Sequence, residues 1–126
     1  MADKNAYPYP SLNTKSMNLS GSFAPNGTGA VDNTQNNGRG FTVARSGVGT
    51  FVITLDAKFV RLRSCGLTVQ LATPANTFAQ LTGETVATTQ TITITTLTAG
   101  AAADIAAAAG NRIHFDLDLS NDTVQR

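Results

Sequence analysis

The sequence predicts an all-β protein: an antiparallel β-sandwich, jelly-roll-like, with an extended N-terminal arm. From Gly40 onward apolar and polar residues alternate with a period of two, which is typical of half-buried strands. Glycine-rich links such as SGVG separate the alternating segments, as in hairpins. Before Gly40 the chain is rich in Asn, Ser, Gly, Pro and Thr, and its apolar residues occur singly. These observations predict an arm over residues 1–39 and a β-sandwich domain over residues 40–126.

The strongest alternation lies in GFTVARSGVGTFVITLD, which predicts a hairpin over Gly40–Asp56 with its loop at Arg45–Gly49. Phe59–Arg63 predicts another strand, with Val60 and Leu62 facing inward. Further strands are predicted at Leu67–Leu71, Thr91–Leu97 and 112–120, and their short links imply a sandwich or a barrel. The predicted core is the set of residues that keep the period of two: Phe51, Ile53, Leu55, Leu67, Val69, Ile92, Ile94, Ile113, Phe115 and Leu117.

One alanine-rich segment, Ala99–Asn111, interrupts the strand pattern. Its helix propensity is high, but Gly100 and Gly110 flank it, and so few residues make a marginal helix. We expect either a short helical turn or a compact loop, held on the sandwich by Ile105.

Composition limits the classes of partner. The chain has 126 residues, enough for one domain with a real core, and a net charge of +1 with 13% charged residues. Nucleic acid and anionic membranes attract clustered Lys and Arg, so neither is expected as a partner. No run of about 18 apolar residues could cross a bilayer, and the N-terminus lacks the apolar region of a signal peptide. We therefore expect synthesis and folding in a cytoplasm.

The most site-like cluster is His114, Asp116 and Asp118, which alternate on one face of the last predicted strand. Neighbouring side chains on such a face stand roughly 6.5 to 7 Å apart, whereas metal ligands converge to about 2.0 to 2.6 Å from one ion. We expect a polar face, paired across strands with Arg61 and Arg63, and no metal.

No other residues suggest catalysis. No serine lies in a G-x-S-x-G sequence, and the single cysteine, Cys65, excludes an intrachain disulfide and is interpreted as a small buried apolar residue. The segments PNGTG and SGVGT lack the lysine of a phosphate-binding loop. The sequence therefore predicts no catalytic residue and no cofactor.

The predicted arm carries apolar residues at intervals. Tyr7, Tyr9, Leu12 and Phe23 are spaced so that each could fill a pocket on a neighbour, and aromatic anchors dominate many interfaces. We expect these four residues to anchor the arm against another subunit or a larger shell. The alternative is a disordered tail with no role.

Several of these segments together resemble small structural proteins of tailed bacteriophages, in particular capsid decoration or cement proteins. The resemblance lies in GFTVARSGVGTFVITLD, LTVQLAT and TITITTLTAGAAADIAAAAGNRIHFDLDLSND, and in the aromatic arm. It implies a non-enzymatic β-rich subunit that forms a homodimer or homotrimer on the outside of the capsid. There it would bind the major capsid protein and bridge neighbouring capsomers.

Two alternatives remain open. A phage tail or fibre module that binds a host-surface glycan or another virion protein would show clustered aromatic residues at loop tips, but this chain has no Trp and two Tyr, both in the predicted arm. An enzyme that uses His114, Asp116 and Asp118 would need further acid or base residues nearby.

Overall fold

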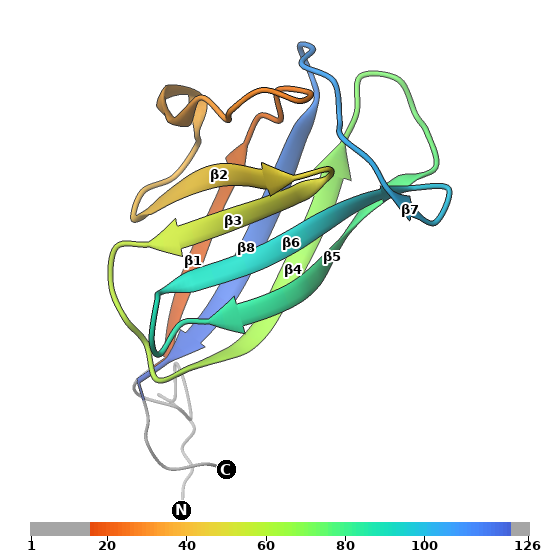
Figure 1. Ribbon diagram of the computed structural model, residues 1–126. Coiled ribbons are helices and arrows are strands. Elements are labelled where there is room, and N and C mark those ends of the chain that lie inside the picture. The colour runs from red at the N-terminus through yellow and green to blue at the C-terminus, as the bar shows by residue number, and fades with distance from the viewer. Residues whose placement is uncertain (1–15, 122–126) are drawn as a thin grey trace, which may run out of the picture.

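The computed structural model describes residues 16–121, which form two antiparallel sheets packed against each other (Figure 1). One sheet has the strand order β1-β8-β4, and the other has the order β2-β3-β6-β5 with β7 beside β6. The strands are β1 Ser16–Phe23, β2 Phe41–Gly47, β3 Thr50–Leu55, β4 Arg61–Gln70, β5 Thr77–Thr85, β6 Thr91–Thr98, β7 Ala101–Ala102 and β8 Arg112–Ser120. A 3-10 turn, η1, spans Asn33–Gln35. The predicted antiparallel β-sandwich is confirmed, while its jelly-roll character stays a prediction.

The core lies between the two sheets and follows the predicted period of two. Eight of the ten predicted residues are buried, and Leu67 and Val69 are half-buried at its margin, because they lie on the edge strand β4. The predicted core omitted several buried residues, namely Phe23, Val31, Phe41, Val43, Phe59, Val86, Ile105 and Leu119. Within residues 16–121 no helix is long and apolar enough to span a membrane.

Two aromatic pairs join the sheets. The rings of Phe41 on β2 and Phe115 on β8 meet edge to face, with centroids 4.8 Å apart. Those of Phe23 on β1 and Phe51 on β3 are tilted, at 5.1 Å. Gly21 makes room for Phe41, because a Cβ atom at this position would lie 2.6 Å from the Phe41 ring. These contacts fix which strands face each other across the core.

The predicted hairpin at Gly40–Asp56 is confirmed as β2 and β3, but the predicted loop at Arg45–Gly49 is too long: β2 continues to Gly47, and only Val48 and Gly49 form the turn. Phe41 pairs with Leu55 and Val43 with Ile53, and a bulge between Arg45 and Gly47 precedes the turn.

The prediction of an arm over residues 1–39 is wrong for residues 16–39. Residues 16–23 form β1, which pairs with β8 along its whole length, from Ser16 with Ser120 to Phe23 with Ile113. The segment that follows packs on the sandwich through the buried Val31. Pairing with β8 supplies the backbone hydrogen bonds and the core contact that this segment could not make within itself.

The predicted strand at Phe59–Arg63 is also shifted. Strand β4 begins at Arg61 and continues through the predicted Leu67–Leu71 strand to Gln70. Val60 is 38% exposed rather than inward, whereas Phe59 is buried. Backbone hydrogen bonds outside the strand ladders hold these two residues before β4 begins: the Phe59 N–H donates to Val86 O, and the Val60 N–H donates to Ser120 O.

Two further segments complete the fold. Strand β5 was not predicted, and it pairs with β6 from Thr77 with Thr98 to Thr85 with Thr91. Of the two alternatives for Ala99–Asn111, the compact loop is correct: it contains the short β7, and Ile105 packs in the core.

Candidate binding surface

The outward side of the four-strand array β2-β3-β6-β5 forms a surface that we call the threonine face. Inner and outer positions alternate along these strands, and the inner ones are buried on β3 and β6, whereas those of β5 are half-buried or exposed. No Asp, Glu, Lys or Arg occupies the outer positions. The threonine face consists of Thr42, Ala44, Thr50, Val52, Thr54, Phe78, Gln80, Thr82, Thr85, Thr91, Thr93, Thr95 and Leu97.

Strand register aligns these residues into rows across the sheet. In one row Thr42 pairs with Thr54, Thr54 with Thr91, and Thr91 with Thr85. Because directly opposite side chains in a sheet lie close together, this row is a continuous line of methyl and hydroxyl groups.

Many of the hydroxyl groups bond to one another. Thr85 Oγ1 contacts Thr89 Oγ1 at 2.6 Å and also bonds Thr91 Oγ1. The hydroxyl of Thr82 donates to the Thr93 carbonyl at 3.3 Å. A hydroxyl that already has a hydrogen-bond partner in the protein has a smaller desolvation cost when a surface covers it, because fewer hydrogen bonds to water must be replaced.

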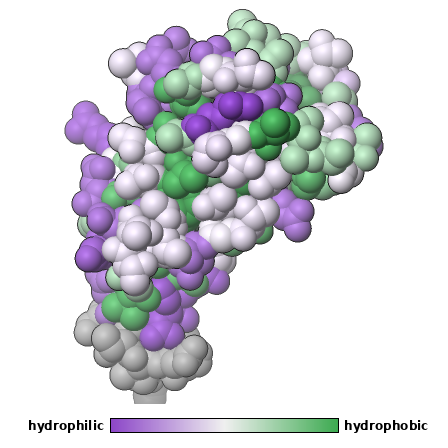
Figure 2. Space-filling model, in the orientation of Figure 1, coloured by the Kyte–Doolittle hydropathy of each residue, from purple (hydrophilic) through white to green (hydrophobic). Residues whose placement is uncertain are grey.

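Figure 2 looks onto this side of the molecule. The surface over β3 and β6 is mostly white, the colour of intermediate hydropathy, with green patches, and most of the purple lies toward the margins. Interface cores are likewise depleted in charged residues, since burying an unpaired charge is costly. The threonine face is therefore suited to being covered.

The opposite side of the sandwich differs in chemistry. There β8 presents His114, Asp116 and Asp118 outward. His114 Nε2 lies 2.8 Å from Gln70 Oε1 on β4, and Asn18 Nδ2 on β1 donates to Asp116 Oδ1 at 2.7 Å. Each of these two groups is engaged by a different neighbouring strand.

The predicted pairing with Arg61 and Arg63 is wrong. Register sets Arg61 opposite Ser120, and the bulge between Leu62 and Ser64 displaces Arg63 from the ladder. In the described part of the chain, no ion pair joins either arginine to this cluster. Across residues 16–121 no group of three His, Cys, Asp or Glu side chains is arranged to hold a metal ion.

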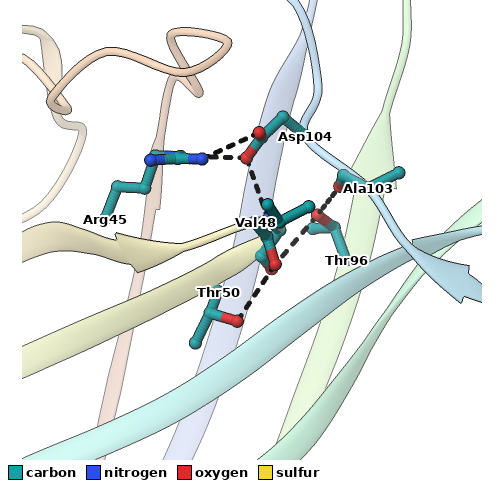
Figure 3. Close-up of polar contacts among 7 residues, drawn as sticks. Arg45, Val48, Thr50, Thr96, Ala103 and Asp104 are labelled. Carbon is teal, nitrogen blue, oxygen red and sulfur yellow. Dashed lines mark hydrogen bonds and ion pairs between the residues drawn. The ribbon is translucent and has the colours of Figure 1, made fainter.

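An ion pair at one end of the sandwich fixes the β2–β3 hairpin (Figure 3). Arg45 donates from Nε and Nη2 to the two carboxylate oxygens of Asp104, both at 2.9 Å. The Gly49 N–H also donates to Asp104 Oδ1, at 2.8 Å. The hydrogen bonds from Arg45, and to a smaller extent the one from Gly49, lower the pKa of Asp104. The same carboxylate raises the pKa of Arg45.

The turn beside this ion pair is packed by backbone contacts. Gly49 has a φ of +63°, and a Cβ atom there would lie 2.7 Å from the carbonyl oxygens of Thr96 and Ala103. Thr96 Oγ1 donates to Ala103 O at 2.7 Å (Figure 3). The ion pair and the turn together hold one end of the threonine face in place.

The predicted anchor residues fall into two groups. Phe23 has no exposed surface and belongs to the core, so it is not available as an anchor on a neighbour. Tyr7, Tyr9 and Leu12 lie outside the described residues. The sequence indicated the outward threonines of β6 but not the joined surface, which exists because β2 and β5 flank β3 and β6.

Comparison with known proteins gives no match: neither a family model, nor a curated protein, nor a solved structure is significantly similar to this chain.

Proposed function

We propose that this chain is a non-enzymatic virion structural protein that binds the outside of a phage capsid and stabilises it by bridging capsomers. Its partners are the major capsid protein and further copies of itself, as a homodimer or homotrimer. The observation that carries the proposal is the threonine face, an uncharged surface on a rigid sheet. The sequence resemblance to phage cement proteins supplies the choice of partner.

The mechanism is multivalent attachment. An oligomer that engages several capsomers gains effective concentration at each further contact, so individually weak contacts add up to firm binding. Tyr7, Tyr9 and Leu12 act as additional anchors from the N-terminal segment. Low charge limits the desolvation cost of covering the threonine face.

Co-sedimentation with empty shells of the phage that encodes the chain tests this function. Thr54→Lys places a charge on the threonine face, at an exposed position of β3 in the row with Thr42 and Thr91. It should weaken binding about tenfold or more, because an unpaired charge in an interface costs more than ~1.4 kcal/mol.

The matched control is Thr68→Lys, an exposed threonine on β4 that faces outward from the other sheet. It should bind like the unmodified chain. If both variants bind equally well, the threonine face is not part of the interface. If the unmodified chain does not sediment with the shells, the proposed function is wrong.

A further inference from the structure

The sandwich has four edge strands, β1 and β4 in one sheet and β2 and β5 in the other. An edge strand presents unpaired backbone N–H and C=O groups that can pair with another chain, and natural proteins usually cover or charge such edges. The four edges of this fold are treated differently.

Two of the edges are each capped at one residue by an asparagine from the segment before β2. Asn33 caps β2 with its side chain: the Val43 N–H donates to Asn33 Oδ1 at 2.8 Å, and Asn33 Nδ2 donates to Val43 O at 3.1 Å. Asn37 caps β1 with its backbone, exchanging two hydrogen bonds of 2.9 Å with Ser22. Each cap reproduces the pairing of a missing strand at that one residue, Val43 of β2 and Ser22 of β1.

The third edge, β4, is protected by charge and irregularity. It carries Arg61 and Arg63, and a bulge interrupts its ladder between Leu62 and Ser64. These features disfavour the addition of a strand.

The fourth edge, β5, is open along Thr77–Leu81. These residues are uncharged and in regular register with β6. Phe78 is 49% exposed on one side of the strand, and Leu81 is 37% exposed on the other. Strand β4 of the other sheet lies close to β5. Among the described residues, however, no hydrogen bond from outside the ladder reaches the backbone of Ala79 or Leu81, and the bond from the Phe59 N–H to Val86 O comes only after the bulge.

The hydrogen bonds of β6 show which β5 groups point outward. Thr96 donates its N–H to Gly49 O and accepts from the Ala103 N–H, so both of its backbone groups point away from β5. Because these directions alternate along a strand, the β6 residues on either side of Thr96 bond β5, at Phe78 and Gln80.

The remaining β5 residues, Thr77, Ala79 and Leu81, therefore direct their backbone groups to the open edge. The N–H of Thr77 already donates a hydrogen bond to Ala75 O. The other groups of these three residues are placed to pair with a neighbouring strand.

We propose that the open edge of β5 pairs with β5 of a second copy of this chain, antiparallel about a two-fold axis at Ala79. In this register Thr77 lies opposite Leu81 of the partner subunit, and Ala79 lies opposite its own copy. The two β2-β3-β6-β5 arrays then form one continuous sheet. This inference rests on the self-association in the proposed function and specifies its surface and symmetry.

The strand itself indicates a second copy as the occupant. A two-fold contact brings the same residues together from both sides, so it needs a self-compatible strand. Residues 77–81 are uncharged, so their pairing with a second copy brings no like charges together. With the two-fold axis at Ala79, each of the five residues lies opposite a residue of the same segment in the partner subunit. Phe78 meets the aliphatic part of the partner's Gln80, and Leu81 meets the partner's Thr77.

The first test is the mass of the unmodified chain in solution, measured by light scattering after gel filtration over a dilution series. We expect twice the mass of one chain. Ala79→Pro removes the N–H that points to the open edge while it leaves the bonds of β5 to β6 intact, so it should give a monomer. A monomeric unmodified chain would overturn the proposal, as would an Ala79→Pro variant that folds and stays dimeric.

Gln80→Lys is a second variant in case Ala79→Pro does not fold. Gln80 is exposed, and the two lysines would meet across the axis, so the dimer should dissociate. Thr42→Lys, exposed on the capped edge strand β2, is the matched control and should stay dimeric. Dissociation by both lysine variants would mean a nonspecific charge effect and would also overturn the pairing.

Cross-linking tests the register. In a Cys65→Ser background, Gln80→Cys should give a covalent dimer with a short bis-maleimide, because diagonal neighbours across paired strands lie about 7 to 8 Å apart. Thr42→Cys should not cross-link, since seven strand spacings of about 4.8 Å would separate the two copies. A dimer that fails to bind capsids would reject the proposed function alone, and a monomer that binds capsids would reject the dimer alone.

Discussion

At the scale of single residues, Phe115 is a large core side chain whose loss should be costly. It is buried at the centre of β8 and meets Phe41 edge to face across the core. Phe115→Ala should lower the free energy of unfolding by roughly 3 to 5 kcal/mol, as for other large-to-small core changes. Denaturant melts give the value, and a loss under about 1 kcal/mol would contradict the assignment of Phe115 to the core.

Cys65, expected to be a buried apolar residue, is only half-buried at the margin of the core, and its chemical reactivity tests this environment. Burial of its thiol raises the pKa, and the negative charge of Asp116 raises it further. The thiolate is the reactive form, so modification by a disulfide reagent at pH 7.5 should be slower in the folded chain than in urea. In the folded chain, the pH at which the rate is half-maximal should lie above about 8.5, the pKa of a free cysteine. A folded chain that reacts as fast as the unfolded one would contradict this pKa shift.

At the scale of elements, the ion pair between the β2–β3 hairpin and the following loop should depend on pH. The pKa of Asp104 is lowered in the folded chain, so its stabilising effect is present above the unfolded value of about 3.9 and is lost as the pH falls through the folded value. Asp104→Asn should therefore melt at a lower temperature than the unmodified chain at pH 7, and this difference should close below about pH 4.

The control for that comparison is Asp56→Asn, which changes an exposed carboxylate after β3. Its melting temperature should follow that of the unmodified chain throughout. A difference for Asp104→Asn that is the same at pH 7 and pH 3 would mean that the carboxylate charge does not hold the hairpin.

The strands that the sequence predicted are those with apolar residues at every second position. Strands β2, β3, β6 and β8 have this pattern, and so does the second half of β4. Strand β1 was missed because Gly21 occupies an inner position beneath Phe41 and its exposed start is mostly polar. Strand β5 was missed because a bulge after Leu81 breaks its alternation.

The candidate surface could be predicted only in part, for a related reason. Alternation alone assigned Thr91, Thr93 and Thr95 to the outer side of one strand. Which strands lie beside it depends on pairing between distant segments. Arg45 and Asp104 are 59 positions apart, and no local pattern links them.

At the scale of the whole molecule, the place of β1 in the sandwich predicts the outcome of truncation. A chain that starts at Ser16 should fold, because β1 and the core remain complete. A chain that starts at Gly38 loses β1, the buried Phe23 and the Asn33 cap, so it should be unfolded or strongly destabilised. Circular dichroism and thermal melts distinguish the two, and a cooperative melt of the shorter chain near that of the longer one would contradict this role of β1.

Both faces of the sandwich lack the side chain with which amine-directed chemical labels react. None of the strands contains a lysine: Lys4 and Lys15 precede β1, and Lys58 lies on the connection between β3 and β4. Reagents directed at primary amines therefore spare the threonine face and the open edge of β5. Dyes, biotin or a sensor chip attached through lysine leave both proposed contact surfaces chemically unmodified.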